Sequence, residues 1–131
     1  MINNAGQPFS GATEPSSLAN ELVAIALDSG DANLQLIHND GIGTCTKINL
    51  GGAFARAANM VVRLDLDFRT PGEIDYTVRR LDAAGSASGT LTTNIPAETT
   101  ALAYSWEAVT DATGTVQALI DFLGMYATIT I

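Results

Sequence analysis

The segment LQLIHNDGIGTCTKINLG, residues 34–51, gathers the residue types best suited to chemistry. It holds the chain's single histidine, His38, and its single cysteine, Cys45, with Asn-Asp-Gly between them. A catalytic histidine needs a nucleophile or a carboxylate beside it, and Asp28 and Asp40 are near in sequence. However, no G-x-S-x-G nucleophile motif occurs anywhere in the chain. We therefore interpret His38 as a hydrogen-bonded residue at the end of a strand.

The cysteine shows no sign of reactivity. Cys45 lies between threonines and not in a cationic pocket, so nothing in the sequence predicts a lowered thiol pKa. One cysteine forms neither an internal disulfide nor a multi-thiolate metal site, and the C-x-x-C and H-x-x-E-H patterns are absent. We expect Cys45 to be a packing residue, and we expect neither a metal site nor a cofactor.

Calcium and phosphate loops are the remaining ligand patterns to consider. The stretches DSGDANL and NDGIGT lack the spaced carboxylates and the final glutamate of a calcium loop. Whether Asp28, Asp31 and Asp40 converge on an ion stays open at this stage. The glycines of residues 41–43 and 51–52 precede further strand patterns and not a helix, so they predict turns and not a phosphate loop.

Two aromatic residues offer a further hypothesis. Trp106 and Tyr104 share one face of the segment ALAYSWEAV, where they could form a platform on which a sugar ring stacks. The alternative is that both are core or interface residues, which we favour because only 6% of the chain is aromatic. These two are the candidate glycan-binding residues, and Asp and Asn residues of the loops would assist them.

Paired carboxylates for glycoside hydrolysis would have to come from Asp65, Asp67, Glu107 and Asp111. Asp65 and Asp67 alternate with apolar residues, which is typical of an ordinary solvated strand face. We therefore predict no catalytic residue and no enzyme activity.

Composition limits the classes of partner. The chain has 131 residues, of which 47% are hydrophobic and 15% charged, as in one packed domain. The net charge is −8 and only six residues are Lys or Arg, so the sequence carries no electrostatic footprint for nucleic acid. No apolar run is long enough for membrane insertion, and the first residues do not form a signal peptide.

The elements that would position these residues are strands. The segment MVVRLDLDF (60–68) alternates between apolar and charged residues. We expect the charged residues to point outward and the following residues to point inward: Met60, Val62, Leu64, Leu66 and Phe68. EIDYTVRRL (73–81) continues the alternation after a TPG turn, and the two segments predict an antiparallel pair. LQLIH and TCTKINL predict a hairpin that turns at Asn39 to Gly43.

Further strands are expected near residues 21–28, 87–93, 101–109 and 115–131, the last broken by Gly124. Helical alternatives exist for 18–27, with Ser17 as a cap, and for 52–64, where we expect a loop or one short turn before a strand. The pattern predicts an all-β fold, an antiparallel β-sandwich that is jelly-roll-like. We expect residues 1–17 to be a flexible leader or linker and 18–131 to be one domain.

Two stretches, HNDGIGTCTK (38–47) and SGTLTTNIPAETT (88–100), together with the aliphatic last strand, resemble the C-terminal β domain of tail-fibre-like virion proteins of phages and prophages. The resemblance covers residues 14–131. Cys45 departs from it, since a small residue is usual there, and residues 75–80 carry more charge. The resemblance implies a β-sandwich structural domain of the virion, in multiple copies, with no catalytic residue to transfer.

The leading hypothesis is therefore a non-enzymatic virion structural protein: a tail fibre, head fibre or decoration domain that assembles as a homo-oligomer, with a trimer favoured, contacts other virion proteins and takes part in host attachment. The apolar end YATITI would promote aggregation if it were exposed, which suggests that it is paired or covered. The alternative is a glycan-binding module at a fibre tip that binds a host surface glycan. A glycosidase or esterase is the least favoured hypothesis.

Overall fold

The computed structural model describes residues 2–3, 14–100 and 103–104, and for residues 2–3 and 103–104 it describes the backbone alone. Most of the expected strands of 101–109 and 115–131 lie outside the described residues, as do Trp106 and the YATITI end. In the part of the chain that is described, no helix is long and apolar enough to cross a membrane.

The first sheet is antiparallel and has the strand order β4-β3-β2-β1-β8. Its longer strands are β2 (Glu21–Ala26), β3 (Gln35–Asp40) and β4 (Thr46–Asn49), and its shortest are β1 (Ile2–Asn3) and β8 (Ala103–Tyr104). Val23 pairs with His38, which in turn pairs with Thr46, so the predicted hairpin is formed. The turn lies two residues later than expected, because β3 continues through Asn39 and Asp40 and β4 begins at Thr46.

The second sheet has the order β5-β6-β7 and is also antiparallel. Its strands are β5 (Val62–Asp67), β6 (Ile74–Arg80) and β7 (Ser86–Leu91). The predicted β5–β6 pair is confirmed, with Leu64 opposite Val78. Gly89 of β7 lies opposite Tyr76, and a Cβ at position 89 would lie 2.9 Å from the Tyr76 hydroxyl oxygen. Glycine therefore allows the tyrosine ring to lie flat against β7.

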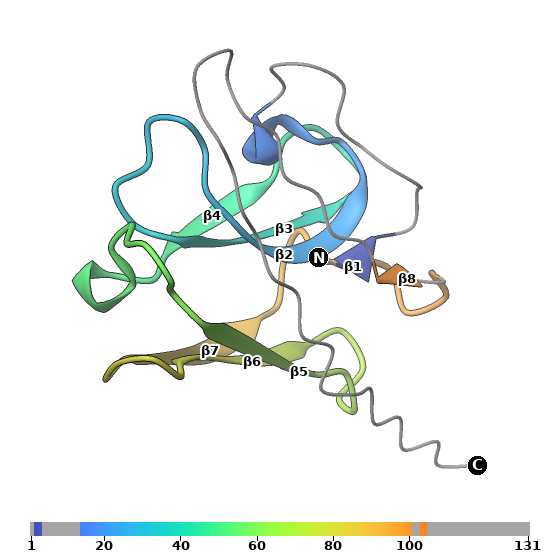
Figure 1. Cartoon of the computed structure of the whole chain (residues 1–131). Coiled ribbons are helices and arrows are strands. Elements are labelled where there is room, and N and C mark those ends of the chain that lie inside the picture. Colours follow the sequence, from blue (N-terminus) through green and yellow to red (C-terminus); the bar gives the residue numbers. More distant parts are fainter. Residues whose placement is uncertain (1, 4–13, 101–102, 105–131) are drawn as a thin grey trace.

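The main core lies between the two sheets, which form two layers in Figure 1. Both sheets contribute inward-facing residues, and the connecting 3-10 turn η2 (Gly52–Phe54) adds Phe54, which is fully buried. Alternation along β6 explains its share of the core, because every second residue of a strand faces the same side. The buried members are Val23, Leu36, Leu50, Phe54, Ile74, Tyr76, Val78 and Leu91.

A second apolar cluster covers the opposite face of the first sheet. Leu22, Ala24 and Ile37 point to this side and are almost completely buried, together with Leu18 and Cys45. The sheet is therefore apolar on both faces, which explains the continuous hydrophobic run of β2. The helical alternative for 18–27 is wrong, because these residues form a strand buried on both sides.

Several local expectations need correction or find support. Phe68 was expected to point inward at the end of β5, but it follows the strand and is 47% exposed. The short turn expected before β5 is confirmed as η2.

Two pieces of the expected leader belong to the fold. Strand β1 lies between β2 and β8. In the 3-10 turn η1 (Pro15–Ser17), the Ser16 carbonyl accepts a hydrogen bond from the Cys45 N–H. The described residues therefore form an all-β fold of two antiparallel layers.

Candidate functional site

The β3–β4 hairpin is organised by one buried amide. The Asn39 side chain is fully buried, and its Nδ2 donates to the Leu18 carbonyl (2.8 Å) and the Gly43 carbonyl (3.2 Å). Its Oδ1 accepts the Gly41 N–H at 3.1 Å. Gly41 and Gly43 have positive φ values of 88° and 73°, which glycine adopts without steric cost. The Asn-Asp-Gly sequence therefore builds a turn, as predicted.

His38 is held by a main-chain group. Its side chain is 3% exposed, and Nδ1 lies 2.9 Å from the Asn94 carbonyl oxygen. A carbonyl oxygen only accepts hydrogen bonds, so Nδ1 carries the proton in this contact. The structure thus brings His38 to a backbone carbonyl from another part of the chain, and neither Asp28 nor Asp40 is its partner at Nδ1.

Asn94 is the central residue of this junction, and the sequence patterns did not single it out. Its φ of 49° is left-handed, a conformation that asparagine tolerates better than most residues. Oδ1 accepts the Asp40 N–H (3.0 Å), while Nδ2 donates to the Thr46 hydroxyl (2.8 Å) and the His38 carbonyl (3.3 Å). One side chain therefore ties the segment after β7 to both strands of the hairpin.

Glu21 fixes the same segment a few residues further on. Its Oε1 accepts the Ala97 N–H at 3.1 Å and the Thr100 hydroxyl at 2.8 Å. Thr100 N–H also donates to the Ala97 carbonyl at 2.9 Å. We call residues 92–100 the strap, because they cross from the second sheet to the first and are fastened at Asn94, Ala97 and Thr100. The two stretches that carry the phage resemblance thus contact each other directly.

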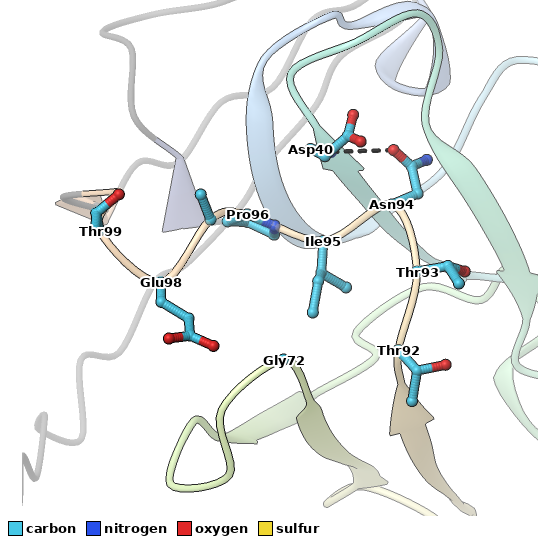
Figure 2. A pocket seen from close by; sticks show the side chains of 10 residues that line it. Asp40, Gly72, Thr92, Thr93, Asn94, Ile95, Pro96, Glu98 and Thr99 are labelled. Atoms are coloured by element: carbon cyan, nitrogen blue, oxygen red, sulfur yellow. Dashed lines mark hydrogen bonds between the residues drawn. The ribbon is translucent and has the colours of Figure 1, made fainter.

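An open hollow of about 410 Å³ lies along the strap. In Figure 2 the Ile95 and Glu98 side chains point from the strap toward the β5–β6 turn at Gly72, whereas the Asn94 side chain points to Asp40. Pro96 is buried, but Glu98 and the neighbouring threonines are exposed. The polar lining consists of Asp40, Thr92, Thr93, Asn94, Glu98 and Thr99. This arrangement offers hydrogen-bonding groups to a hydroxyl-rich ligand without aligning a nucleophile with a base.

The possible ion ligands do not converge on an ion. Lys47 Nζ lies 2.8 Å from Asp28 Oδ2 and 2.7 Å from Asp31 Oδ2, so an ammonium group occupies the space between these carboxylates. Burial opposes ionisation of Asp28, but hydrogen bonds from Lys47 and Ser16 outweigh it and lower the pKa of Asp28. Asp40 lies apart, with Oδ1 accepting the Ile42 N–H. Within the described ranges, no three His, Cys, Asp or Glu side chains group as metal ligands.

The thiol of Cys45 is a packing group. It is 9% exposed, and its Sγ lies 3.4 Å from the Leu18 carbonyl oxygen. Burial raises the pKa of the Cys45 thiol above its usual value. A protonated, buried thiol is a weak nucleophile, so the expected packing role fits its surroundings.

The other sequence candidates are dispersed or undescribed. Asp65 and Asp67 lie on the outer face of the second sheet and pair with Arg63 and Arg69, as solvated surface residues do. Of the expected aromatic platform, Tyr104 belongs to β8, but only its backbone is described. Trp106, Glu107 and Asp111 lie outside the described residues.

Comparison with known proteins adds no relative: no family model matches the sequence, and no match was found among the curated proteins or the solved structures. The function is therefore argued from the residues and their geometry.

Proposed function

We propose that this chain is a non-enzymatic structural domain of a phage virion, a fibre or decoration domain that assembles with copies of itself, most favourably as a trimer, and with other virion proteins. The observation that carries the proposal is the Asn94 junction. It joins the two stretches of the phage resemblance, residues 38–47 and 88–100, into one hydrogen-bonded unit. The two stretches would then occur together for a structural reason, because each supplies hydrogen-bond partners to polar groups of the other.

The chemistry of the rare residues supports a structural role. His38 contacts a carbonyl, Asn39 has its amide occupied on both sides, and Cys45 is buried with a raised pKa. Catalysis needs a nucleophile or base that can reach a substrate, and these groups are used to hold the backbone instead. A domain whose polar groups are used in this way acts through its surface. Assembly and host attachment are surface functions.

The first experiment is to measure the mass of the full chain in solution by light scattering after gel filtration, from micromolar to high concentration. We expect a trimer or a multiple of it. A well-folded monomer over the whole range would overturn the assembly. Mass spectrometry of phage particles purified from the strain that carries the coding sequence is the second experiment. Finding the chain in those particles is expected, and its absence would overturn the virion role.

Glycan binding at a fibre tip is the second candidate, favoured by the hollow along the strap. The exposed Glu98 carboxylate and the Thr92, Thr93 and Thr99 hydroxyls can exchange hydrogen bonds with sugar hydroxyls. This site supplements the aromatic platform of Tyr104 and Trp106. Titration of the chain with neutral host oligosaccharides tests it.

A Glu98→Gln variant should weaken glycan binding if the hollow is the site, whereas Asp65→Asn on the distant outer face should not. Equal affinity in both variants and the wild type would move the site away from the hollow. Loss of binding in Trp106→Ala alone would favour the aromatic platform.

A further inference from the structure

Strand β7 forms one border of the second sheet. Among the described residues it pairs with β6 alone, and the register runs without a bulge from Ile74 opposite Leu91 to Arg79 opposite Ser86. Ser86, Ser88, Gly89 and Thr90 are exposed. A straight, exposed edge strand offers its free N–H and C=O groups to another strand.

The border strands β4 and β5 carry features that discourage such pairing, and the remaining border strand, β8, has only two residues. β4 is four residues long and carries Lys47, and its Thr46 hydroxyl already receives a bond from Asn94. β5 carries Arg63, Asp65 and Asp67. By contrast, β7 reads SASGTL and contains neither a charge nor a proline. Charged residues and proline are the usual protection of an edge, and β7 lacks both.

The main-chain groups of β7 that point away from β6 can be deduced from the ladder. Arg80 N–H donates to the Gly85 carbonyl at 2.9 Å, which makes these two a hydrogen-bonded pair. Hydrogen-bonded and non-bonded pairs alternate along an antiparallel ladder. Residues 87, 89 and 91 then bond to β6, so the N–H and C=O groups of Ser86, Ser88 and Thr90 point outward.

Apart from Asp65, which lies opposite Thr77 in the row between them, the charges of the outer face fall into two rows across the sheet. One row is basic in β5 and β6, and the other is acidic there, while both end in a hydroxyl residue of β7. Asp75 also accepts a hydrogen bond from the Thr90 hydroxyl at 2.5 Å. The rows are Arg63–Arg79–Ser86 and Asp67–Asp75–Thr90.

We propose that β7 is the site at which a second copy of this chain pairs its own β7, antiparallel and about a twofold axis at Ser88. In that register Ser88 faces its counterpart, and Ser86 faces Thr90 of the second copy. Three hydrogen-bonded pairs form, which contribute about six main-chain hydrogen bonds. Hydroxyl side chains meet on the outer face, a favourable pairing in antiparallel sheets.

Charge complementarity selects this partner and this direction. The antiparallel register continues the basic row of one copy into the acidic row of the other, so Arg79 and Asp75 of opposite copies share a line across the joined sheet. A parallel pairing of the same two edges would turn the outer face of one copy to the other side of the joined sheet, so the charged rows would not meet. The contact rests on the proposed assembly of copies, and it joins them in pairs, because a twofold contact closes after two copies. The β7 contact therefore joins two trimers when the proposed trimer forms, and two single copies when it does not.

Substitutions at the twofold axis test this directly. Ser88→Lys places two ammonium groups against each other, and Ser88→Glu places two carboxylates, so each variant alone should associate about tenfold more weakly than the wild type. A one-to-one mixture should recover association, since lysine then faces glutamate. Analytical ultracentrifugation at low salt measures all three, because salt screens the effect. Thr44→Lys is the matched control, because Thr44 is exposed in the β3–β4 turn and not on the second sheet, and it should associate as the wild type does.

Urea unfolding first establishes that each variant folds. Unchanged association of the Ser88→Lys and Ser88→Glu variants would overturn the β7 contact, as would a mixture that behaves like the separate variants. A wild-type mass that is a trimer and never doubles would also overturn it, while leaving the proposed assembly intact. A monomer at every concentration would overturn both. Variants that change only the unfolding midpoint would show that the edge is covered within one chain.

Discussion

The two sheets differ in what covers their faces. The first sheet has an apolar cluster on each side, with Val23 and Leu36 facing the second sheet and Leu22 and Ile37 facing away. The second sheet is apolar only on its inner side, and its outer side carries polar residues such as Thr77. A sheet buried on both faces is scaffold, whereas a sheet with a solvated face can present residues to a partner. We therefore assign the structural role to the first sheet and the proposed contact between copies to the second.

The ionic contacts follow the same division. Lys47 lies between Asp28 and Asp31 in a part-buried cluster that also holds the Ser16 N–H, so it links β4 to the loop after β2 and to η1. The pairs of the second sheet, such as Arg63 with Asp65, are exposed neighbours on one strand. Exposed pairs contribute about 0–1 kcal/mol, because solvent screens the charges. The ion pairs thus join separate segments in the first sheet, whereas the Arg63–Asp65 and Arg69–Asp67 pairs of the second sheet join near neighbours in the chain.

The contrast between the two sheets would fail most clearly if a buried side chain of the first sheet could be shortened without loss of stability. Leu22→Ala removes a fully buried side chain from the outer cluster. We expect it to lower the free energy of unfolding by about 2–5 kcal/mol, since the cavity adds to the lost burial. Thr77→Ala on the outer face of the second sheet should change it by less than about 0.5 kcal/mol. Urea unfolding measures both, and similar losses would refute the contrast.

Asn94 tests whether the strap depends on side-chain hydrogen bonds or on backbone conformation. Asn94→Ala removes the bonds to Asp40, Thr46 and the His38 carbonyl and puts alanine at φ 49°, so we expect a loss of about 2–3 kcal/mol. Asn94→Gly keeps the backbone conformation accessible and should lose about 1 kcal/mol less. Equal losses from the two variants in urea unfolding would assign the whole effect to the bonds.

Acidification should weaken the cluster of the first sheet. The folded-state pKa of Asp28 lies below its unfolded value, so its contribution is complete above the unfolded pKa near 3.8 and is lost as the pH falls through the folded pKa. Lys47 has a raised pKa, so its contribution is lost only as the pH rises through that value, above 10.5. Lys47→Met should make the unfolding midpoint in urea less sensitive to acid between about pH 5 and 2. The same acid sensitivity as in the wild type would exclude this cluster as the cause.

The smallest effect is expected at a partly buried ion pair beside the second sheet, Arg80 with Asp82. A hydrogen bond from Arg80 lowers the pKa of Asp82 to about 2. Carboxyl carbon chemical shifts followed by NMR should give that midpoint, and Arg80→Gln should return it toward 3.8. The Arg80 side chain is only 14% exposed and also donates to the Ala53 carbonyl, so the variant should lower the unfolding midpoint at neutral pH, but by less than Leu22→Ala does. A drop as large as that of Leu22→Ala would show that this pair stabilises the fold as much as a fully buried side chain.

Local patterns predicted the elements of the second sheet well. Ile74, Tyr76 and Val78 were expected inside and are buried, because alternation along a strand depends on neighbouring residues only. The predicted inward orientation of Phe68 was wrong, because β5 ends one residue earlier and the alternation no longer applies there. The helical alternative at 18–27 arose because a strand buried on both faces has no alternation to read.

The candidate site was predictable only in its parts. The Asn-Asp-Gly turn followed from the sequence, as did the unreactive character of Cys45. Asn94 could not be identified as the partner of His38, since the two lie 56 residues apart. The only local signal is an asparagine two residues before a proline, and it predicts a turn and not a partner.

By itself, the amino-acid sequence determined the all-β class, the hairpin and the acidic character of this protein, because steric preference, alternation and net charge are properties of neighbouring residues or of the total composition. Only the tertiary structure decided that Lys47 lies between Asp28 and Asp31, that the strap is fastened to the hairpin, and that β7 forms an uncharged border. These arrangements depend on burial and hydrogen bonds between residues that are far apart in the sequence, and such contacts form only when the two sheets pack together.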